Sequence, residues 1–307
     1  RIARLAPSTT YHLAVRARDA AGHLAPLSNA VSVTTTAAID PEDRGRVIPA
    51  PHGSGLIFEN GTPFVPVGDH LGISWGYYRN LYPAPVWDPV NQQFLDLSTQ
   101  PGVEGEAGPH FSAIAASGVN TLRVFLELLD GDQTGNPSAM PAGRYWIAFP
   151  SGVYNDALRT LVLDALEEAA ANGMYLIFSP FDTFTWDEAF TLETPWYSAN
   201  GGPLASIDDF FQNGQTLQKC KDRLREVMDW VALSPYKDHL LGWEPLNEWD
   251  SYEWTLNAEG GSEPGRETEM RRRAIWIRDL NQYVREQDPD HLVISSSVQL
   301  DPHGPVH

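Results

Sequence analysis

The sequence is poor in cysteine, in basic residues and in long hydrophobic runs. Cys220 is the single cysteine, so no disulfide can form within the chain, and its place in an apolar helical pattern indicates a small core residue. Only 21 Lys and Arg stand against 40 Asp and Glu. The resulting charge of -19 argues against nucleic acid or anionic lipid as a partner, because both need clustered basic side chains. No apolar run approaches the roughly 18 residues of a membrane span, so none is expected.

What is present is the composition of a folded protein. Hydrophobic residues make up 42% and charged residues 20% of the 307, which is enough to fill a core and suits neutral ligands. The chain starts at Arg1 without a signal-type segment, and residues 1–40 differ in character from the rest. We therefore expect a fragment of a longer protein, for which the missing signal peptide says nothing about export.

The amino-terminal residues alternate apolar and polar side chains. Residues 10–19 and 29–35 predict two antiparallel strands, with the turn pair Ala21-Gly22 between them. The run from Leu5 to Tyr11 resembles the tyrosine corner of fibronectin type III domains, and the sequence through residue 36 resembles the last two strands of that domain. An arbitrary hairpin is the alternative. The resemblance implies that residues 1–36 are the carboxyl-terminal part of such a domain. Residues 37–52 are rich in proline and charge and predict a linker.

From residue 53 to residue 307 the pattern becomes α/β. Residues 56–65 predict a hairpin on a type I′ turn at Asn60-Gly61. Short apolar runs that are typical of buried parallel strands follow, separated by amphipathic helices. The strands are expected at residues 64–68, 121–126, 174–179, 240–246 and 292–296, and the clearest helices at residues 156–171, 215–233 and 267–286.

The lengths of the connections are unequal. Helix-to-strand links are short, whereas strand-to-helix links run over residues 69–109, 127–154 and 180–214. A (β/α)8 TIM barrel carries its active site on the strand-to-helix loops, so the α/β pattern predicts a barrel with its chemistry on that face. A doubly wound open sheet is the alternative, disfavoured because no glycine-rich phosphate turn follows the first strand. Five of eight strands are counted, so we expect truncation at both ends, unpaired sheet edges and aggregation of the isolated chain.

The end of the fourth predicted strand carries the most informative motif. Trp243-Glu244-Pro-Leu-Asn247-Glu248 resembles the Trp-Glu-x-x-Asn-Glu motif of clan A glycoside hydrolases, close to family 5 with its cellulases and mannanases. Apolar neighbours would raise the pKa of Glu248 and suit it to general acid catalysis. The alternative is a solvated glutamate at a strand end. The resemblance implies that Glu248 is the acid/base and that Asn247 holds the sugar 2-hydroxyl.

Arg123 lies in the second predicted strand, in Gly118-Val-Asn-Thr-Leu-Arg123-Val-Phe-Leu, which resembles the clan A strand whose arginine lies under the catalytic carboxylates. Because burying an unpaired arginine in so apolar a strand is costly, Arg123 is expected to have an anionic partner. An ordinary salt bridge at the rim of the barrel is the alternative. Glu244 stands four residues before Glu248, or ~13 Å along a strand, too far for the ~5–5.5 Å carboxylate pair of a retaining enzyme. We expect Glu244 to pair with an arginine or with backbone donors inside the barrel. The resemblance places the nucleophile on a seventh strand, so the chain alone is expected to be inactive.

Aromatic and polar residues after the strands are candidates for sugar binding, because flat rings pack on sugar C–H faces. For each aromatic residue, loop packing is the alternative. Phe181-Asp182-Thr-Phe184 lacks the histidine that the clan often shows after its third strand. His303 and His307 flank Gly and Pro and are not expected to bind metal, and no cofactor is expected. The predicted substrate-binding residues are Asp69, His70, Trp75, Asp182, Trp186, Trp249 and Trp254.

Together these features predict a retaining glycoside hydrolase that acts on β-linked glycosides of the β-mannan or β-glucan type. The partner is an oligo- or polysaccharide, and no protein partner can be inferred. The resemblance to an extracellular domain implies a secreted or cell-surface protein. A non-catalytic carbohydrate-binding protein on a degenerate barrel is the alternative, and a nucleotide-dependent enzyme is disfavoured because no phosphate-binding loop is present.

Overall fold

The chain divides into two units, Arg1–Gly45 and Arg46–His307. In the first unit, β1 (Thr10–Leu13) pairs antiparallel with β2 (Val31–Thr34), as the alternating pattern predicted. The computed structural model describes residues 10–14, 16, 25, 28–34, 44–53, 55–70, 86–88, 93–95, 107–127, 146–182, 194–250 and 263–296.

The second unit is built on a parallel sheet whose described strands are β6 (Gly68–His70), β9 (Thr121–Phe125), β10 (Tyr175–Ser179), β11 (Leu240–Trp243) and β12 (Leu292–Val293). Their order in the sheet is β12-β11-β10-β9-β6, so each strand pairs with the next along the chain without reversal. A doubly wound sheet reverses its strand order at a switch point. The uninterrupted order is that of consecutive units of a (β/α)8 barrel, which confirms the predicted fold class.

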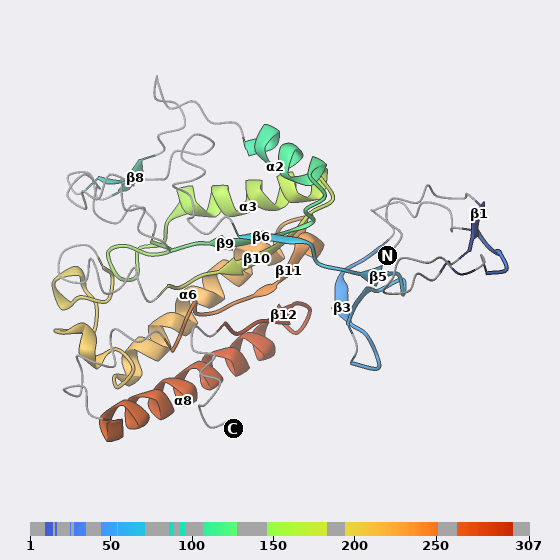
Figure 1. Ribbon diagram of the computed structural model, residues 1–307. Coiled ribbons are helices and arrows are strands. Elements are labelled where there is room, and N and C mark those ends of the chain that lie inside the picture. Colours follow the sequence, from blue (N-terminus) through green and yellow to red (C-terminus); the bar gives the residue numbers. More distant parts are fainter. Residues whose placement is uncertain are drawn as a thin grey trace. The chain divides into compact units, whose positions relative to one another are not determined.

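Helices run beside this sheet (Figure 1). They are α2 (Ala107–Ala116), α3 (Asp156–Ala171), α6 (Gly214–Ala232) and α8 (Glu263–Gln287). The helix α3 begins and ends where the apolar period predicted, and the Asn155 side chain caps it by accepting the N–H of Leu158. The helix α3 contacts β10, α6 contacts both α3 and α8, and α8 contacts β12. Three short 3₁₀ turns complete the unit at Ser198–Asn200, Ile207–Asp209 and Lys237–His239.

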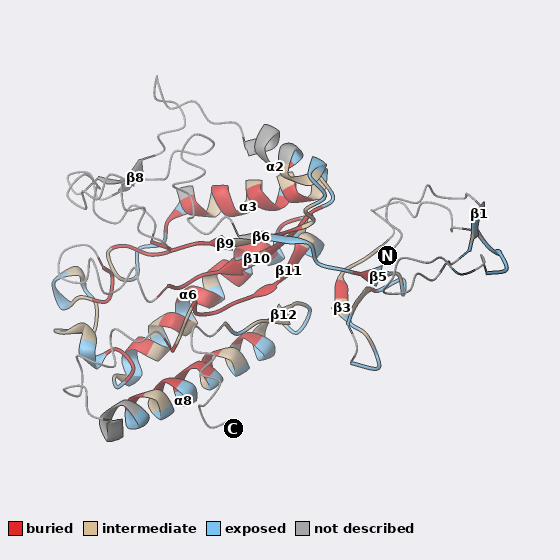
Figure 2. Cartoon of the chain, viewed as in Figure 1, coloured by how far each residue is buried: buried red, intermediate tan, exposed pale blue. Residues whose placement is uncertain are grey.

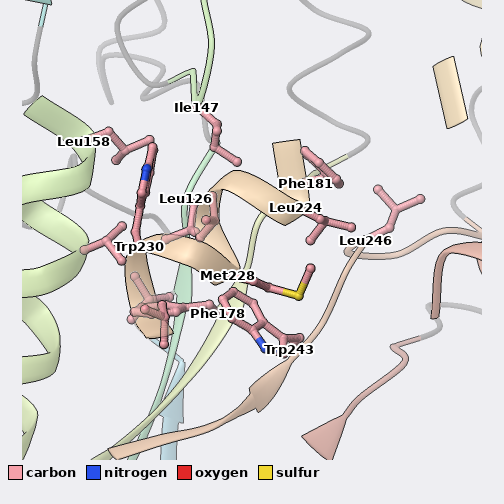
Figure 3. Close-up of a cluster of buried hydrophobic side chains, with 14 of the residues drawn as sticks. Leu126, Ile147, Leu158, Phe178, Phe181, Leu224, Met228, Trp230, Trp243 and Leu246 are labelled. Atoms are coloured by element: carbon pink, nitrogen blue, oxygen red, sulfur yellow. The ribbon is translucent and has the colours of Figure 1, made fainter. Parts of the chain in front are cut away.

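Most of the core lies between the sheet and the helices. Leu122 and Val124 of β9 and Leu176 and Phe178 of β10 belong to one buried cluster with apolar residues of α3 and α6. Figure 2 shows β9, β10 and β11 and the sheet-facing sides of these helices as mostly buried. Figure 3 shows part of the cluster, with side chains of α3, α6, β10 and β11 gathered together. Alternation along β9 therefore turns Arg123, between Leu122 and Val124, toward the other face of the sheet.

A small antiparallel sheet lies at the amino-terminal ends of the parallel strands. It consists of β3 (Val47–Pro49), β4 (Leu56–Phe58) and β5 (Pro63–Phe64). Val47, Phe58 and Phe64 form a second buried cluster with Tyr175 at the start of β10 and Leu241 of β11. This small sheet therefore packs against the amino-terminal ends of β10 and β11, away from the predicted site at their carboxyl ends.

Three predictions about this region are wrong. The linker at residues 37–52 includes β3, because Val47 is apolar and buried against Phe58. The turn at Asn60-Gly61 is not type I′, which needs positive φ at both residues. Gly61 has φ 85°, but Glu248 is the one non-glycine residue of the described ranges with positive φ, and Phe58 N–H donates across a three-residue loop to Thr62 O.

The third concerns the first parallel strand, which was predicted at residues 64–68 but is β6, Gly68–His70. Phe64 belongs to β5, and Val65 and Val67 are exposed. The side chain of Asn120 holds this stretch, since its Oδ1 accepts the N–H of Val67 and its Nδ2 donates to the carbonyl of Val65. Asp69 and His70 therefore lie within the first parallel strand and not after it.

A short antiparallel pair of strands, β7 (Val86–Asp88) and β8 (Gln93–Leu95), lies in the long connection between β6 and α2. Among the described residues no helix is both long and apolar enough to cross a membrane.

Candidate active site

Arg123, in the middle of β9, forms the base of the candidate site. Its neighbours Leu122 and Val124 are buried in the core, so strand alternation turns Arg123 to the opposite face. There its Nε donates to Oε2 of Glu244 at 2.5 Å, its Nη2 forms an ion pair with the same oxygen, and its guanidinium lies 4.6 Å from the centre of the Phe125 ring. The predicted anionic partner of Arg123 is thus Glu244.

Glu244 follows β11 directly and is 1% exposed. Its N–H donates to the carbonyl of Phe178 at 2.8 Å, which continues the pairing between β10 and β11 for one more residue. The strand was predicted to run to residue 246 but ends at Trp243, before Pro245, which has no N–H to donate. The pairing of Glu244 with an arginine inside the barrel is confirmed.

Asn247 is held from three directions. Its backbone N–H donates to the carbonyl of Phe181 at 2.9 Å. Its side-chain Oδ1 accepts from Nη2 of Arg123 at 2.5 Å, and its Nδ2 donates to Oδ1 of Asp182 at 2.9 Å. Asp182, after β10, is 2% exposed. The carboxyl ends of β9, β10 and β11 therefore meet in a polar chain from Glu244 through Arg123 and Asn247 to Asp182.

Glu248 follows Asn247 directly in the sequence and is more exposed than Asn247. It is partly buried, and its φ of 46° lies in the left-handed region. Its backbone N–H donates to the Oγ of Ser296 at 3.1 Å, beyond β12. Burial raises the pKa of Glu248 above that of an ordinary glutamate, and the charge of Asp182 adds to this, while Arg123 opposes it. A partly buried carboxyl group with a raised pKa is suited to donate a proton near neutral pH.

Trp249 is partly buried and packs against the main core cluster. The register of β6 and β9 places His70 opposite Arg123 and Asp69 opposite Leu122. Substrate contact by these residues stays a prediction, as it does for the buried Asp182. Trp75, Trp186 and Trp254 lie outside the described residues.

Sequence reasoning missed a buried ion pair beside the site. Glu127 follows β9 and accepts from Nη1 of Arg223 of α6 at 2.9 Å and from the N–H of Ile147 at 2.9 Å. Arg223 also donates to the carbonyl of Ala148 and lies 4.4 Å from the centre of the Trp196 ring. Burial raises the pKa of Glu127 to about 7. The position of Glu127 directly after the strand predicted at residues 121–126 was the signal that could have identified it.

Ser296 was also missed, because a lone serine at the end of a predicted strand carries no signal until the fold brings it to Glu248. Within the described ranges, no cluster of three or more His, Cys, Asp or Glu side chains could hold a metal ion. The described site thus offers carboxylates, an amide and a guanidinium, which are groups suited to proton transfer and to hydrogen bonding with hydroxyl groups.

No family model matches the sequence. A rice (Oryza sativa subsp. japonica) protein named "Putative mannan endo-1,4-beta-mannosidase 9" is 26% identical over 148 residues, which are 46% of this chain and 32% of that protein. The crystal structure of a glycoside hydrolase family 5 mannosidase from Rhizomucor miehei has a TM-score of 0.50 at 16% identity and covers 84% of this chain and 57% of its own. The exo-beta-1,4-mannosidase Op5Man5 from Opitutaceae bacterium strain TAV5 has a TM-score of 0.46 at 19% identity, over 78% of this chain and 33% of its own.

The resemblance to family 5 glycoside hydrolases is confirmed by these comparisons, and the fold is that of their barrel. The chain spans about a third of the length of the rice protein and little more than half of the fungal one.

Proposed function

We propose that this chain is part of a retaining glycoside hydrolase that acts on β-linked mannan. The observation that carries the proposal is Glu248, a partly buried carboxyl group with a raised pKa at the carboxyl end of a barrel strand. Asn247 and Arg123 are bonded to each other beside it. The rice protein and the fungal structure are both named as mannosidases, which favours mannan over the β-glucan that the motif left open.

In this proposal Glu248 first protonates the oxygen of the leaving group and then removes a proton from the incoming water. Asn247 holds the 2-hydroxyl of the sugar, a contact that strengthens in the transition state. Arg123 pairs with Glu244 and presents Asn247. The nucleophile is a second glutamate on a seventh strand, as the resemblance implies.

A leaving-group series on Glu248→Gln tests the proposal in the full-length protein that contains this chain. General acid catalysis is worth roughly 10² to 10⁴ in rate, and a good leaving group needs no proton. We expect a loss of that size on β-mannan oligosaccharides and a much smaller loss on a nitrophenyl β-mannoside. Azide should partly rescue the variant and yield a β-mannosyl azide. Equal losses on both substrates would remove Glu248 from the role of proton donor.

A non-catalytic carbohydrate-binding protein is the competing function. Measuring mannan binding and mannan turnover on the same preparation, with Glu248 intact, distinguishes the two functions. A non-catalytic binder would bind mannan but would show no turnover. A turnover rate on soluble β-glucan above that on β-mannan would contradict the choice of substrate while leaving the reaction type in place.

We also propose that residues 1–36 are the end of a fibronectin type III domain and that the protein is secreted or displayed on the cell surface. The antiparallel pairing of β1 with β2 supports the first of these. Solving the structure of the full-length amino-terminal region, together with fractionation of the producing cells, tests both.

A further inference from the structure

Asp182 and Arg123 hold opposite ends of the Asn247 side chain. The guanidinium of Arg123 reaches Oδ1, and the carboxylate of Asp182 accepts from Nδ2 at 2.9 Å. A bridge between the backbones of Asp182 and Asn247 brings the two residues together. The Asp182 side chain is therefore part of the framework of the site.

The chemistry of the three groups permits one arrangement of the amide. A guanidinium has donors only, and an ionised carboxylate has acceptors only. If the amide of Asn247 were rotated by half a turn, its NH₂ group would face Arg123 and its oxygen would face Asp182, and both hydrogen bonds would be lost. Asp182 and Arg123 together thus define which side of Asn247 can donate to a ligand.

We propose that Asp182 is a positioning residue, which holds the amide of Asn247 in one orientation and places a negative charge beside Glu248. The inference rests on the proposed function for the roles of Asn247 and Glu248. It assigns to Asp182 a role different from the direct contact with substrate hydroxyl groups that the sequence predicted. The near-complete burial of Asp182, at 2% exposure, favours the positioning role.

The charged groups around Glu248 set the sign of the effect. Asp182, Asp250 and Glu244 each raise the pKa of Glu248 through their negative charge, Arg123 lowers it, and the contribution of Asp182 is the largest of these four. Removing the charge of Asp182 therefore lowers the pKa of Glu248. A general acid is active while protonated, so activity in the variant is lost at a lower pH than in the wild type.

Two substitutions separate the hydrogen bond from the charge. Asp182→Asn keeps an oxygen that can accept from Asn247 but removes the charge, whereas Asp182→Ala removes both. In the full-length protein we expect Asp182→Asn to shift the basic limb of the kcat/KM profile on β-mannan oligosaccharides to lower pH. We expect Asp182→Ala to lose about 10-fold in kcat with KM nearly unchanged, because the amide of Asn247 is no longer oriented. Asp229→Asn, which removes an exposed charge from α6, should change neither quantity.

Measuring the pKa of Glu248 directly does not depend on turnover, so it tests this inference separately from the proposed function. Glutamate labelled with ¹³C at the carboxyl carbon, with the Glu248 signal assigned through Glu248→Gln, reports the pKa of Glu248 in wild type and in Asp182→Asn by NMR. A lower value in the variant supports the proposal even if no glycoside is cleaved. An unchanged value together with an unmoved pH profile would overturn it. A rise in KM at constant kcat in Asp182→Ala would assign Asp182 to direct sugar binding instead.

Discussion

Glu248 has a backbone conformation that residues other than glycine adopt rarely, with φ 46°, and such a conformation costs of order 1 kcal/mol or more. The bond from its N–H to the Oγ of Ser296 supports it. We expect Ser296→Ala to lower kcat/KM about 5-fold in the full-length protein by releasing the peptide that carries Glu248. Ser296→Thr keeps the hydroxyl group and should retain most of the activity. Equal activity of Ser296→Ala and wild type would show that the peptide is held by other contacts.

Glu244 acts on the site through Arg123 and not through the substrate. Glu244→Gln removes the negative charge that pairs with Arg123 on the face of the sheet opposite to the main core. We expect the free energy of unfolding to fall by roughly 2 kcal/mol, the scale of a hydrogen bond to a charged group. Urea denaturation of the full-length protein measures this, with Glu267→Gln as control, because the ion pair of Glu267 with Arg271 is exposed on α8 and is worth little. Similar losses in both variants would contradict the assignment.

At the scale of elements, β11 and β12 approach so closely that only glycine fits at position 242. A Cβ there would lie 2.5 Å from the carbonyl oxygen of Leu292. We expect Gly242→Ala to cost about 1–3 kcal/mol in unfolding free energy, as overpacking does. Gly214→Ala is the matched control, since nothing lies within 4 Å of a Cβ at this first residue of α6. The melting temperatures of both variants test this prediction. An unchanged melting temperature for Gly242→Ala would show that β11 and β12 can move apart without cost.

The pair of Glu127 and Arg223 links the end of β9 to α6. The burial of Glu127 gives the unit a pH dependence, which the charge of Arg223 opposes. The pKa of Glu127 is raised from 4.5 to about 7 in the folded protein, so the folded state binds the proton more tightly than the unfolded state. The stability that this group contributes is present below pH ~4.5 and is lost as the pH rises toward 7, by at most about 3 kcal/mol. Glu127→Gln should remove this part of the slope. Urea unfolding at pH 5, 6 and 7 checks it, and parallel slopes for the two proteins would contradict it.

At the scale of the whole molecule, both clusters of buried hydrophobic side chains found among the described residues lie within the unit Arg46–His307. Removing residues 1–45 should therefore shift its melting temperature by no more than about 2 °C. Removing residues 1–49 also deletes β3 and with it Val47, whose burial is worth roughly 1.5–3 kcal/mol, so this truncation should melt about 5 °C lower. Calorimetry on the two truncations is the measurement. Equal melting temperatures would place β3 outside the cooperative unit.

The sequence by itself determined the class of the fold and predicted the residues of the candidate site. The 3.6-residue period placed α3 at its observed bounds, and buried apolar runs located β9 and β10, because both signals depend on neighbouring residues alone. Arg123, Asn247 and Glu248 were predicted because the motifs around them resemble those of clan A glycoside hydrolases, and because an arginine in an apolar strand needs an anionic partner. The first parallel strand and the turn at Asn60 were predicted wrongly, since prolines and a side chain distant in sequence, Asn120, decide that stretch.

Only the tertiary structure decided how these residues act on one another. The hydrogen bond of Asp182 with Asn247 joins residues 65 positions apart, and that of Ser296 with Glu248 joins residues 48 apart. Periodicity and local motifs carry no information about such pairs. The raised pKa of Glu127 likewise depends on burial between β9 and α6. Local sequence specifies helices and strands because each has its own side-chain period. The charges and orientations in a site depend instead on which strand ends the parallel sheet brings together.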